Sequence, residues 1–343
     1  MRHVLSTAVL LILGAAFVLG QTPPPAPTGL VVGSGNFFSP ITADLDRTTA
    51  FYRDGLGFAV NGTVSNAADN VPIRRMFGLP DAQLRWLVAR PASMRGGVEM
   101  VEVKKVTTHP LARNVQGPGA VTLVLAVRDI DVLLPRLTML GGTIVTTTGG
   151  PVSATLGGAP ARAALVRTPD GHFLQLVQRP QAAGAAATNS APLVGEVRVR
   201  LTVDSVDRAM RLYRDDLGLQ EQSVGSFNDN RAIMQMLGLN GGAFRQAITT
   251  VPGSGLFVQF IEFKDVERHT VRGEIQDPGS TRVQLQVKDL AAATGAIVRA
   301  GGQVVSSEAK PVELPGGQGR TIKAAVVRDP DNLFLVLIEA PRP

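Results

Sequence analysis

One stretch of this chain occurs twice, and its pattern constrains the fold more than any other feature. Residues 41–58 read ITADLDRTTAFYRDGLGF, and residues 201–219 read LTVDSVDRAMRLYRDDLGL. In both copies apolar residues first alternate and then recur at helical spacing, which predicts a strand followed by a short amphipathic helix. Asp44 in the first copy, and Asp204 or Ser205 in the second, can accept hydrogen bonds from the free N–H groups at the helix start. Near its end each copy carries a glycine, which favours the end of a helix.

The similarity between the two halves of the chain continues beyond this stretch. Residues 98–104 (VEMVEVK) match residues 258–264 (VQFIEFK), and His109 matches His269. The matching positions lie about 160 residues apart, which is too long for a solenoid repeat and suits a duplicated domain. The chain is therefore expected to contain two related domains.

We expect these domains at residues 35–180 and 194–343, joined by residues 181–193, an Ala/Gly/Ser-rich linker with little to bury. Each half also carries a weaker internal repeat, because a second helix start follows at Asp129 in the first half and at Asp289 in the second. The chain therefore consists of four strand–helix–three-strand units of the α+β class. Pairing the two units of one half would curve their sheets around a shared cleft.

The N-terminus indicates export. Residues 1–20 have the layout of a secretory signal peptide, in which Arg2 precedes an apolar run with small residues. Residues 21–34 form a proline-rich leader. A permanent membrane anchor is the weaker alternative, because the apolar run is short for a membrane span. We expect a periplasmic or secreted protein with no membrane contact after signal cleavage, and the absence of cysteine excludes disulfide bonds.

The net charge of +6 raises the question of a nucleic-acid partner. The basic residues are dispersed, and the chain has only two tyrosines and one tryptophan. It therefore lacks the basic and aromatic surface on which single-stranded nucleic acids stack. We expect a small-molecule ligand and no nucleic acid, and a homodimer stays open.

Two kinds of motif carry a resemblance to a known superfamily. One is FYRDGLGF at residues 51–58, with a counterpart at residues 212–218. The other is TPDGHFLQ at residues 168–175, with a counterpart at residues 329–336. These residues resemble the vicinal oxygen chelate superfamily, which includes glyoxalase I, extradiol dioxygenases, methylmalonyl-CoA epimerase and the fosfomycin and bleomycin resistance proteins. The resemblance implies four βαβββ modules paired into two tandem glyoxalase-like domains, each with a cleft that often holds a divalent metal.

In this superfamily each module offers one metal-ligand position, on its first or its last strand. The resemblance places the first-strand positions at Phe37, Thr122, Arg198 and Arg282, and the last-strand positions at Glu99, Gln175, Gln259 and Val336. Only one of these residues is a carboxylate, whereas a divalent ion needs several carboxylate or imidazole ligands. We expect no cofactor and at least one metal-free domain. If a metal binds, Glu99 is its first ligand.

Three residues are candidates for catalysis. Glu99 could act as a general base in an otherwise apolar cleft, or it could form a structural pair with a nearby arginine such as Arg85. His109 and His269 occupy matching places between modules, where pinning the connection is the alternative role. His172, in the turn of the second motif, is expected to be exposed.

Polar residues at alternate positions of the first strands predict a binding site. Arg198 and Arg200 share one strand face, and Arg282 and Gln284 share another. If the modules of the second half pair, Arg198 and Arg282 lie on opposite sides of its cleft and form a site for an anion or carboxylate. Solvated arginines are the alternative. The ligand-binding candidates are Phe37, Thr122, Gln175, Arg198, Arg200, Gln259, Arg282 and Gln284.

Three hypotheses for function follow. The first is an exported tandem glyoxalase-like protein that binds or transforms a small oxygenated or anionic metabolite, with at least one metal-free domain. The second is a metal-dependent glyoxalase or extradiol dioxygenase that acts around Glu99. The third is a non-catalytic protein that binds or sequesters a drug. Metal content and ligand screening would separate them.

Overall fold

The computed structural model describes residues 29–60, 64–66, 71–94, 96–180, 192–315 and 320–340. The expected signal peptide at residues 1–20 lies outside the described residues, as do residues 181–191 of the expected linker. Export and the domain boundaries therefore stay predictions.

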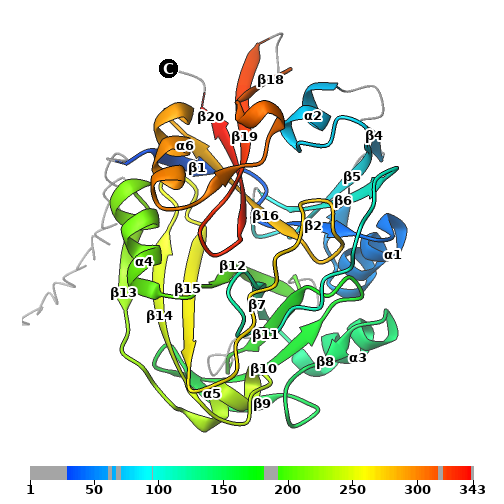
Figure 1. Cartoon of the computed structure of the whole chain (residues 1–343). Helices are drawn as coiled ribbons and strands as arrows, with labels where there is room; N and C mark the ends of the chain where they lie inside the picture. Colours follow the sequence, from blue (N-terminus) through cyan, green and yellow to red (C-terminus); the bar gives the residue numbers. More distant parts are fainter. Residues whose placement is uncertain are drawn as a thin grey trace, which may run out of the picture.

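The described strands form two large β-sheets (Figure 1). Sheet 1 takes from the first half of the chain β1 (Val31–Ser34), β2 (Ser39–Thr42), β3 (Ala59–Val60), β4 (Ser65–Asn66), β5 (Gln83–Arg90) and β6 (Val98–Lys104). It takes from the second half β16 (Thr281–Val287), β17 (Gln303–Val304), β18 (Val312–Pro315), β19 (Thr321–Arg328) and β20 (Phe334–Glu339). The strand order is β17-β19-β20-β16-β2-β6-β5-β3, with β1 beside β16, β18 beside β19 and β4 beside β5.

Sheet 2 combines the remaining described strands. From the first half come β7 (Val121–Val127), β8 (Thr143–Ile144), β9 (Val152–Leu156), β10 (Ala159–Arg167) and β11 (Phe173–Gln178). From the second half come β12 (Val194–Thr202), β13 (Gln220–Val224), β14 (Ala243–Thr250) and β15 (Phe257–Lys264). The order is β13-β14-β15-β12-β7-β11-β10-β8, with β9 beside β10.

Each sheet therefore joins one module from each half of the chain. In sheet 1, β2 and β16 are antiparallel, with Ser39 opposite Arg282. In sheet 2, β7 and β12 are antiparallel, with Leu123 opposite Val199. The α+β class and the four-module organisation are confirmed. The expectation that the two modules of one half enclose a shared cleft is wrong.

The reason lies in what a periodic pattern encodes. Alternation of apolar and polar residues determines which face of a strand is buried, and it says nothing about which edge meets another strand. The first strands of all four modules have similar patterns, so the sequence does not select among their edges. The two connections, residues 105–120 and 265–280, contact each other, with Leu111 N–H donating to Pro278 O (2.9 Å).

The helices begin where the sequence places acceptor side chains. The principal helices are α1 (Leu45–Ala50), α3 (Ile130–Met139), α4 (Val206–Met210) and α6 (Leu290–Arg299). Their N-cap residues Asp44, Asp129, Ser205 and Asp289 each accept a hydrogen bond from a backbone N–H of the first turn. Ser205, and not Asp204, is thus the cap of the second copy. α1 and α4 continue as single π-helical turns, η1 (Phe51–Gly55) and η2 (Arg211–Asp216).

Two short helices cover the opposite face of the sheets. α2 (Val71–Met76), from the first module, packs against β18 and β19 of the fourth module. α5 (Arg231–Met236), from the third module, packs against β9 and β10 of the second. Figure 1 shows α2 beside β18 and α5 near β9. A short 3-10 helix, η3 (Ser307–Ala309), precedes β18. Among the described residues no helix is long and apolar enough to cross a membrane.

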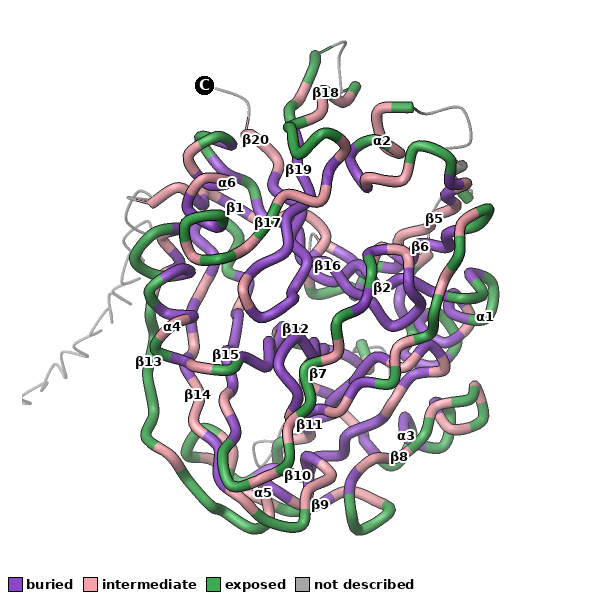
Figure 2. The backbone as a smooth tube through the Cα atoms, viewed as in Figure 1, coloured by how far each residue is buried: buried purple, intermediate pink, exposed green. Residues whose placement is uncertain are grey.

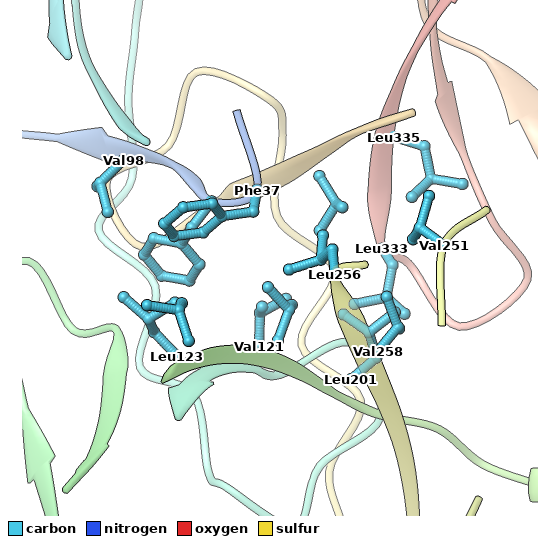
Figure 3. Close-up of a cluster of buried hydrophobic side chains, with 14 of the residues drawn as sticks. Phe37, Val98, Val121, Leu123, Leu201, Val251, Leu256, Val258, Leu333 and Leu335 are labelled. Atoms are coloured by element: carbon cyan, nitrogen blue, oxygen red, sulfur yellow. The ribbon is translucent and has the colours of Figure 1, made fainter. Parts of the chain in front are cut away.

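The largest core lies on the helix side of both sheets. It contains Val98 and Leu335 from sheet 1 together with Leu123 and Leu201 from sheet 2 (Figure 3). Figure 2 shows the central strands buried and the peripheral segments exposed. The alternation predicted for β12 and β16 is confirmed, because the following residues are all buried in this core: Val199, Leu201, Val203, Val283, Leu285 and Val287.

A buried carboxylate links the two modules of the first half. Asp170, in the turn before β11, accepts hydrogen bonds from four groups near the start of α1: Thr42 Oγ1 (2.9 Å), Ala43 N (3.1 Å), Arg47 Nη2 (2.9 Å) and Thr48 Oγ1 (2.5 Å). The sheets join modules of different halves, whereas this turn joins the two modules of the first half. Both kinds of contact hold the modules together.

The equivalent turn repeats this arrangement in the second half. Asp331, before β20, accepts hydrogen bonds from Asp204 N (3.0 Å) and Arg208 Nη2 (2.6 Å). The repeated Asp of the second sequence motif thus holds the helix start of the neighbouring module in both halves.

Candidate functional site

The face of sheet 1 opposite the main helices forms a cavity of about 210 Å³, which we call the sheet-1 cavity. It is lined by Ile73, Met76, Phe77, Leu84, Trp86, Glu99, Val101, Arg282, Gln284, Leu314, Val336 and Ile338. Nearly all of these side chains are apolar. The exceptions, Glu99, Arg282 and Gln284, lie on β6 and β16, the two strands on either side of β2.

Arg282 is the unusual residue of this cavity. Its side chain is fully buried, and none of its three guanidinium nitrogens has a hydrogen-bond partner in the described structure. The ring of Phe77 lies over the guanidinium at 4.4 Å. Burial lowers the pKa of Arg282 to about 10, so the group stays charged at neutral pH. A buried cation without hydrogen bonds is costly for the fold, which points to a polar partner supplied from the cavity.

Glu99 lies beside Arg282 without bonding to it. Glu99 Oε2 is 3.9 Å from Arg282 Nη2 and accepts hydrogen bonds from Gln284 Nε2 (2.8 Å) and Ser39 Oγ (3.2 Å). The gap between the two charged groups suits a small group that accepts from the guanidinium and donates to the carboxylate. The arginine beside Glu99 is thus Arg282, and the suggestion of Arg85 is wrong, because Arg85 bonds to Glu102 (2.9 Å).

The corresponding face of sheet 2 forms the sheet-2 cavity, of about 140 Å³. Arg200, buried on β12, lies among its lining residues and donates from Nη1 to Gln175 Oε1 (2.5 Å) and from Nε to Gln259 Oε1 (3.2 Å). Arg198 also lines this cavity and pairs with Glu196 (2.5 Å). Burial lowers the pKa of Arg200 to about 10.

Because each sheet joins modules of different halves, the residues predicted from the sequence are divided between the two cavities in a different way than expected. Arg198 and Arg282 were expected across one cleft, but they belong to different sheets, so that prediction is wrong. Glu99 and Gln175 likewise lie in different cavities. Phe37 is buried in the main core rather than in a cavity lining, because its ring packs toward Val98 and Leu123 (Figure 3).

None of the described histidines lines either cavity. The backbone N–H of His109 donates to Asp277 Oδ1 (2.8 Å), and His269 Nε2 lies 2.8 Å from Glu267 Oε1 at an exposed position. The His109 bond involves the backbone and not the imidazole, and the His269 ring contacts a residue two positions away, so the roles of both residues stay predictions. His172 was expected to be exposed, but it is buried: its ring bonds to Ile41 O (3.2 Å) and Thr281 Oγ1 (3.1 Å). Burial lowers the pKa of His172 to about 4.

Two cavity residues escaped the sequence reasoning. Trp86, the only tryptophan of the chain, lies on β5 opposite Val101 of β6. Phe77 follows α2 and covers Arg282. Alternation along β5 could have placed Trp86 on the cavity face, whereas the position of Phe77 depends on how α2 packs across the sheet.

The metal-ligand positions implied by the resemblance do not form a metal site here. In sheet 1 they hold one carboxylate beside a buried guanidinium, which would repel a cation. In sheet 2 they hold Thr122, Gln175, Arg198 and Gln259, without a carboxylate or imidazole. Across the described residues, no three His, Cys, Asp or Glu side chains are grouped as a metal site would require. The donor set does not fit a divalent ion.

Comparisons with known proteins agree with this fold. Residues 37–176 match the model of the Glyoxalase/Bleomycin resistance protein/Dioxygenase superfamily. The structure of glyoxalase I from Zea mays is similar, with 19% identity, coverage of 89% of this chain and 92% of that chain, and a TM-score of 0.57. A putative dioxygenase from Bacillus subtilis subsp. subtilis str. 168 is 12% identical, with 92% and 87% coverage and a TM-score of 0.51. No curated protein sequence matches the chain.

At these identities the structural likeness shows the fold alone, and the match to the superfamily model adds the sequence relationship. That match covers the first two modules, and the third and fourth modules repeat their strand order and their capped helices. Residues 37–176 therefore match the Glyoxalase/Bleomycin resistance protein/Dioxygenase superfamily in sequence, and the chain as a whole shares the fold of glyoxalase I.

Proposed function

We propose that this chain binds a small, largely apolar oxygenated molecule in the sheet-1 cavity, without a metal. The observation that carries the proposal is Arg282, a fully buried guanidinium without hydrogen bonds on the wall of an otherwise apolar cavity. A protein retains a buried guanidinium without hydrogen bonds at a cost in stability, and cavities with few polar groups are typical of ligand sites.

The charges of the cavity indicate a ligand without net charge. Among the described residues that line it, only Arg282 and Glu99 are charged, and their charges cancel. A hydroxyl group can accept a hydrogen bond from Arg282 and donate one to Glu99 at the same time. A cavity of roughly 150 Å³ is known to hold benzene, so about 210 Å³ accommodates one ring with a short polar substituent.

Benzyl alcohol is the probe that these features select. Trp86 lines the cavity and is the chain's only tryptophan, so its fluorescence reports binding there. Arg282→Met should weaken benzyl alcohol binding about tenfold or more, because a hydrogen bond to a charged group contributes roughly 1.5–3 kcal/mol. The melting temperature of the same variant is recorded as well, because the change removes the cation beside Glu99 and a loss of stability must be separated from a loss of binding.

The matched control is Arg198→Met in the sheet-2 cavity, which should leave the Trp86 titration unchanged. Unaltered benzyl alcohol affinity in Arg282→Met would contradict the proposal. So would a lower melting temperature together with retained binding, because Arg282 would then be a structural residue.

A further inference from the structure

We infer that the sheet-2 cavity is a second and chemically different binding site, selective for a small amphipathic anion such as a carboxylate on a single ring, with Arg200 as its anchor. The inference does not rest on the function proposed for the sheet-1 cavity, because it concerns other strands, other residues and a ligand of different charge.

Arg200 is a buried cation that lacks a counter-charge. Among the described residues it forms no ion pair, and its hydrogen bonds go to the neutral amide oxygens of Gln175 and Gln259. Neutral amides orient a guanidinium but do not compensate its charge. A carboxylate entering the cavity would supply the missing charge and could accept two parallel hydrogen bonds.

The surroundings hold the guanidinium in place. Gln175 donates from Nε2 to the sulfur of Met236 (3.2 Å), which fixes its amide with the oxygen toward Arg200. Thr122, opposite Arg200 on β7, is buried with a hydroxyl that has no partner in the described structure. Thr122 thus lies next to Arg200 in the sheet with its hydrogen-bonding capacity unused, although it does not line the cavity.

The net charge of the lining separates this cavity from the sheet-1 cavity. Its charged residues are Arg179, Arg198, Arg200 and Glu196, three cations and one anion, and the anion is already paired with Arg198. The resulting excess of positive charge attracts anions. In the sheet-1 cavity one cation and one anion cancel.

The walls exclude a purely polar anion. Met236, Phe244 and Ile261 line the cavity with other apolar side chains, and its volume of about 140 Å³ is close to the roughly 150 Å³ that holds one benzene ring. An apolar ring contributes burial of its own surface, which phosphate or sulfate lacks. The cavity thus fits an aromatic or short-chain monocarboxylate.

The test uses 4-fluorobenzoate as the probe, observed by fluorine NMR with the full chain. We expect binding that inorganic phosphate displaces weakly, and Trp86 fluorescence should not change because Trp86 lies in sheet 1. Arg200→Met should weaken binding about tenfold or more, and Arg200→Lys should weaken it less, because lysine keeps the charge and loses the planar fork. Arg282→Met is the matched control and should bind 4-fluorobenzoate like the wild type.

The lysine variant keeps the test decisive if Arg200→Met fails to fold. Loss of binding in Arg282→Met but not in the Arg200 variants would place the carboxylate in the other cavity and overturn the inference. Equal affinity for benzyl alcohol and 4-fluorobenzoate at the sheet-2 cavity would also overturn it, since charge would then play no part. Failure of the benzyl alcohol experiment alone would leave this result unaffected.

Discussion

Separately expressed halves, residues 29–180 and 192–340, are expected to be unfolded or self-associated alone and to assemble into a one-to-one complex when mixed. Each half contains strands whose sheet neighbours lie in the other half: β2 needs β16, and β7 needs β12. Residues at these joints, such as Leu123 and Val199, are fully buried in the intact chain. Each such side chain contributes roughly 1.5–3 kcal/mol when it is buried, so a lone monomeric half loses more than a typical domain's stability.

Light scattering after gel filtration, with thermal unfolding followed by circular dichroism, measures this result. A chain cut between residues 180 and 192 after folding is the control, and it should keep its melting temperature. A half that folds cooperatively as a monomer would contradict the pairing of modules from different halves in each sheet. Homodimers of one half would agree with it, because β2 of one copy could then pair with β7 of another.

Asp170→Ala should lower the free energy of unfolding by about 3 kcal/mol. The carboxylate is almost completely buried and accepts hydrogen bonds from Thr42, Ala43, Arg47 and Thr48. Its removal leaves buried donors without partners, and breaking such a buried network typically costs about 3–5 kcal/mol. We take the lower end because Arg47 is half-exposed and can bond to water instead.

Urea denaturation of the wild type and the variant measures the difference. Asp54→Ala is the control, because Asp54 pairs with Arg53 at an exposed position and its loss should leave the midpoint almost unchanged. A change as small for Asp170 as for Asp54 would show that the turn does not hold the modules together.

Much of the local structure could be predicted from the sequence. Alternation identified the buried faces of β12 and β16, and Asp44, Asp129 and Asp289 were correctly placed at helix starts. These features depend on residues close in the chain, so a single sequence contains the information. The repeated motifs also indicated the module and the superfamily. Residues 37–176 match the superfamily model, and the similar structures confirm the fold.

The pairing of modules could not be predicted in the same way. It depends on which strand edges meet across more than 200 residues, as between Ser39 and Arg282, and local patterns are the same for either choice. This one error separated Glu99 from Arg282 in the predicted clefts. For the same reason the sequence did not predict that Glu99 and Arg282 lie together in the sheet-1 cavity, or that Arg200 lacks a counter-charge in the sheet-2 cavity.

The burial of individual side chains was the second feature that could not be predicted from the sequence. His172 sits in a turn motif that usually faces solvent, and only the neighbouring module buries it beside Ile41 and Thr281. Phe77 becomes a cavity residue because α2 packs across onto β18 and β19. Both placements follow from contacts between modules, which no local pattern specifies.

Metal-independent binding in the sheet-1 cavity is the central claim, and one measurement tests it most directly. Purified protein is treated with EDTA, its metal content is determined by mass spectrometry, and the same sample is titrated with benzyl alcohol while Trp86 fluorescence is recorded. Our account predicts far less than one metal ion per chain before treatment and the same affinity before and after it. Stoichiometric metal whose removal abolishes the Trp86 response would contradict the account and would make Glu99 the first metal ligand to replace.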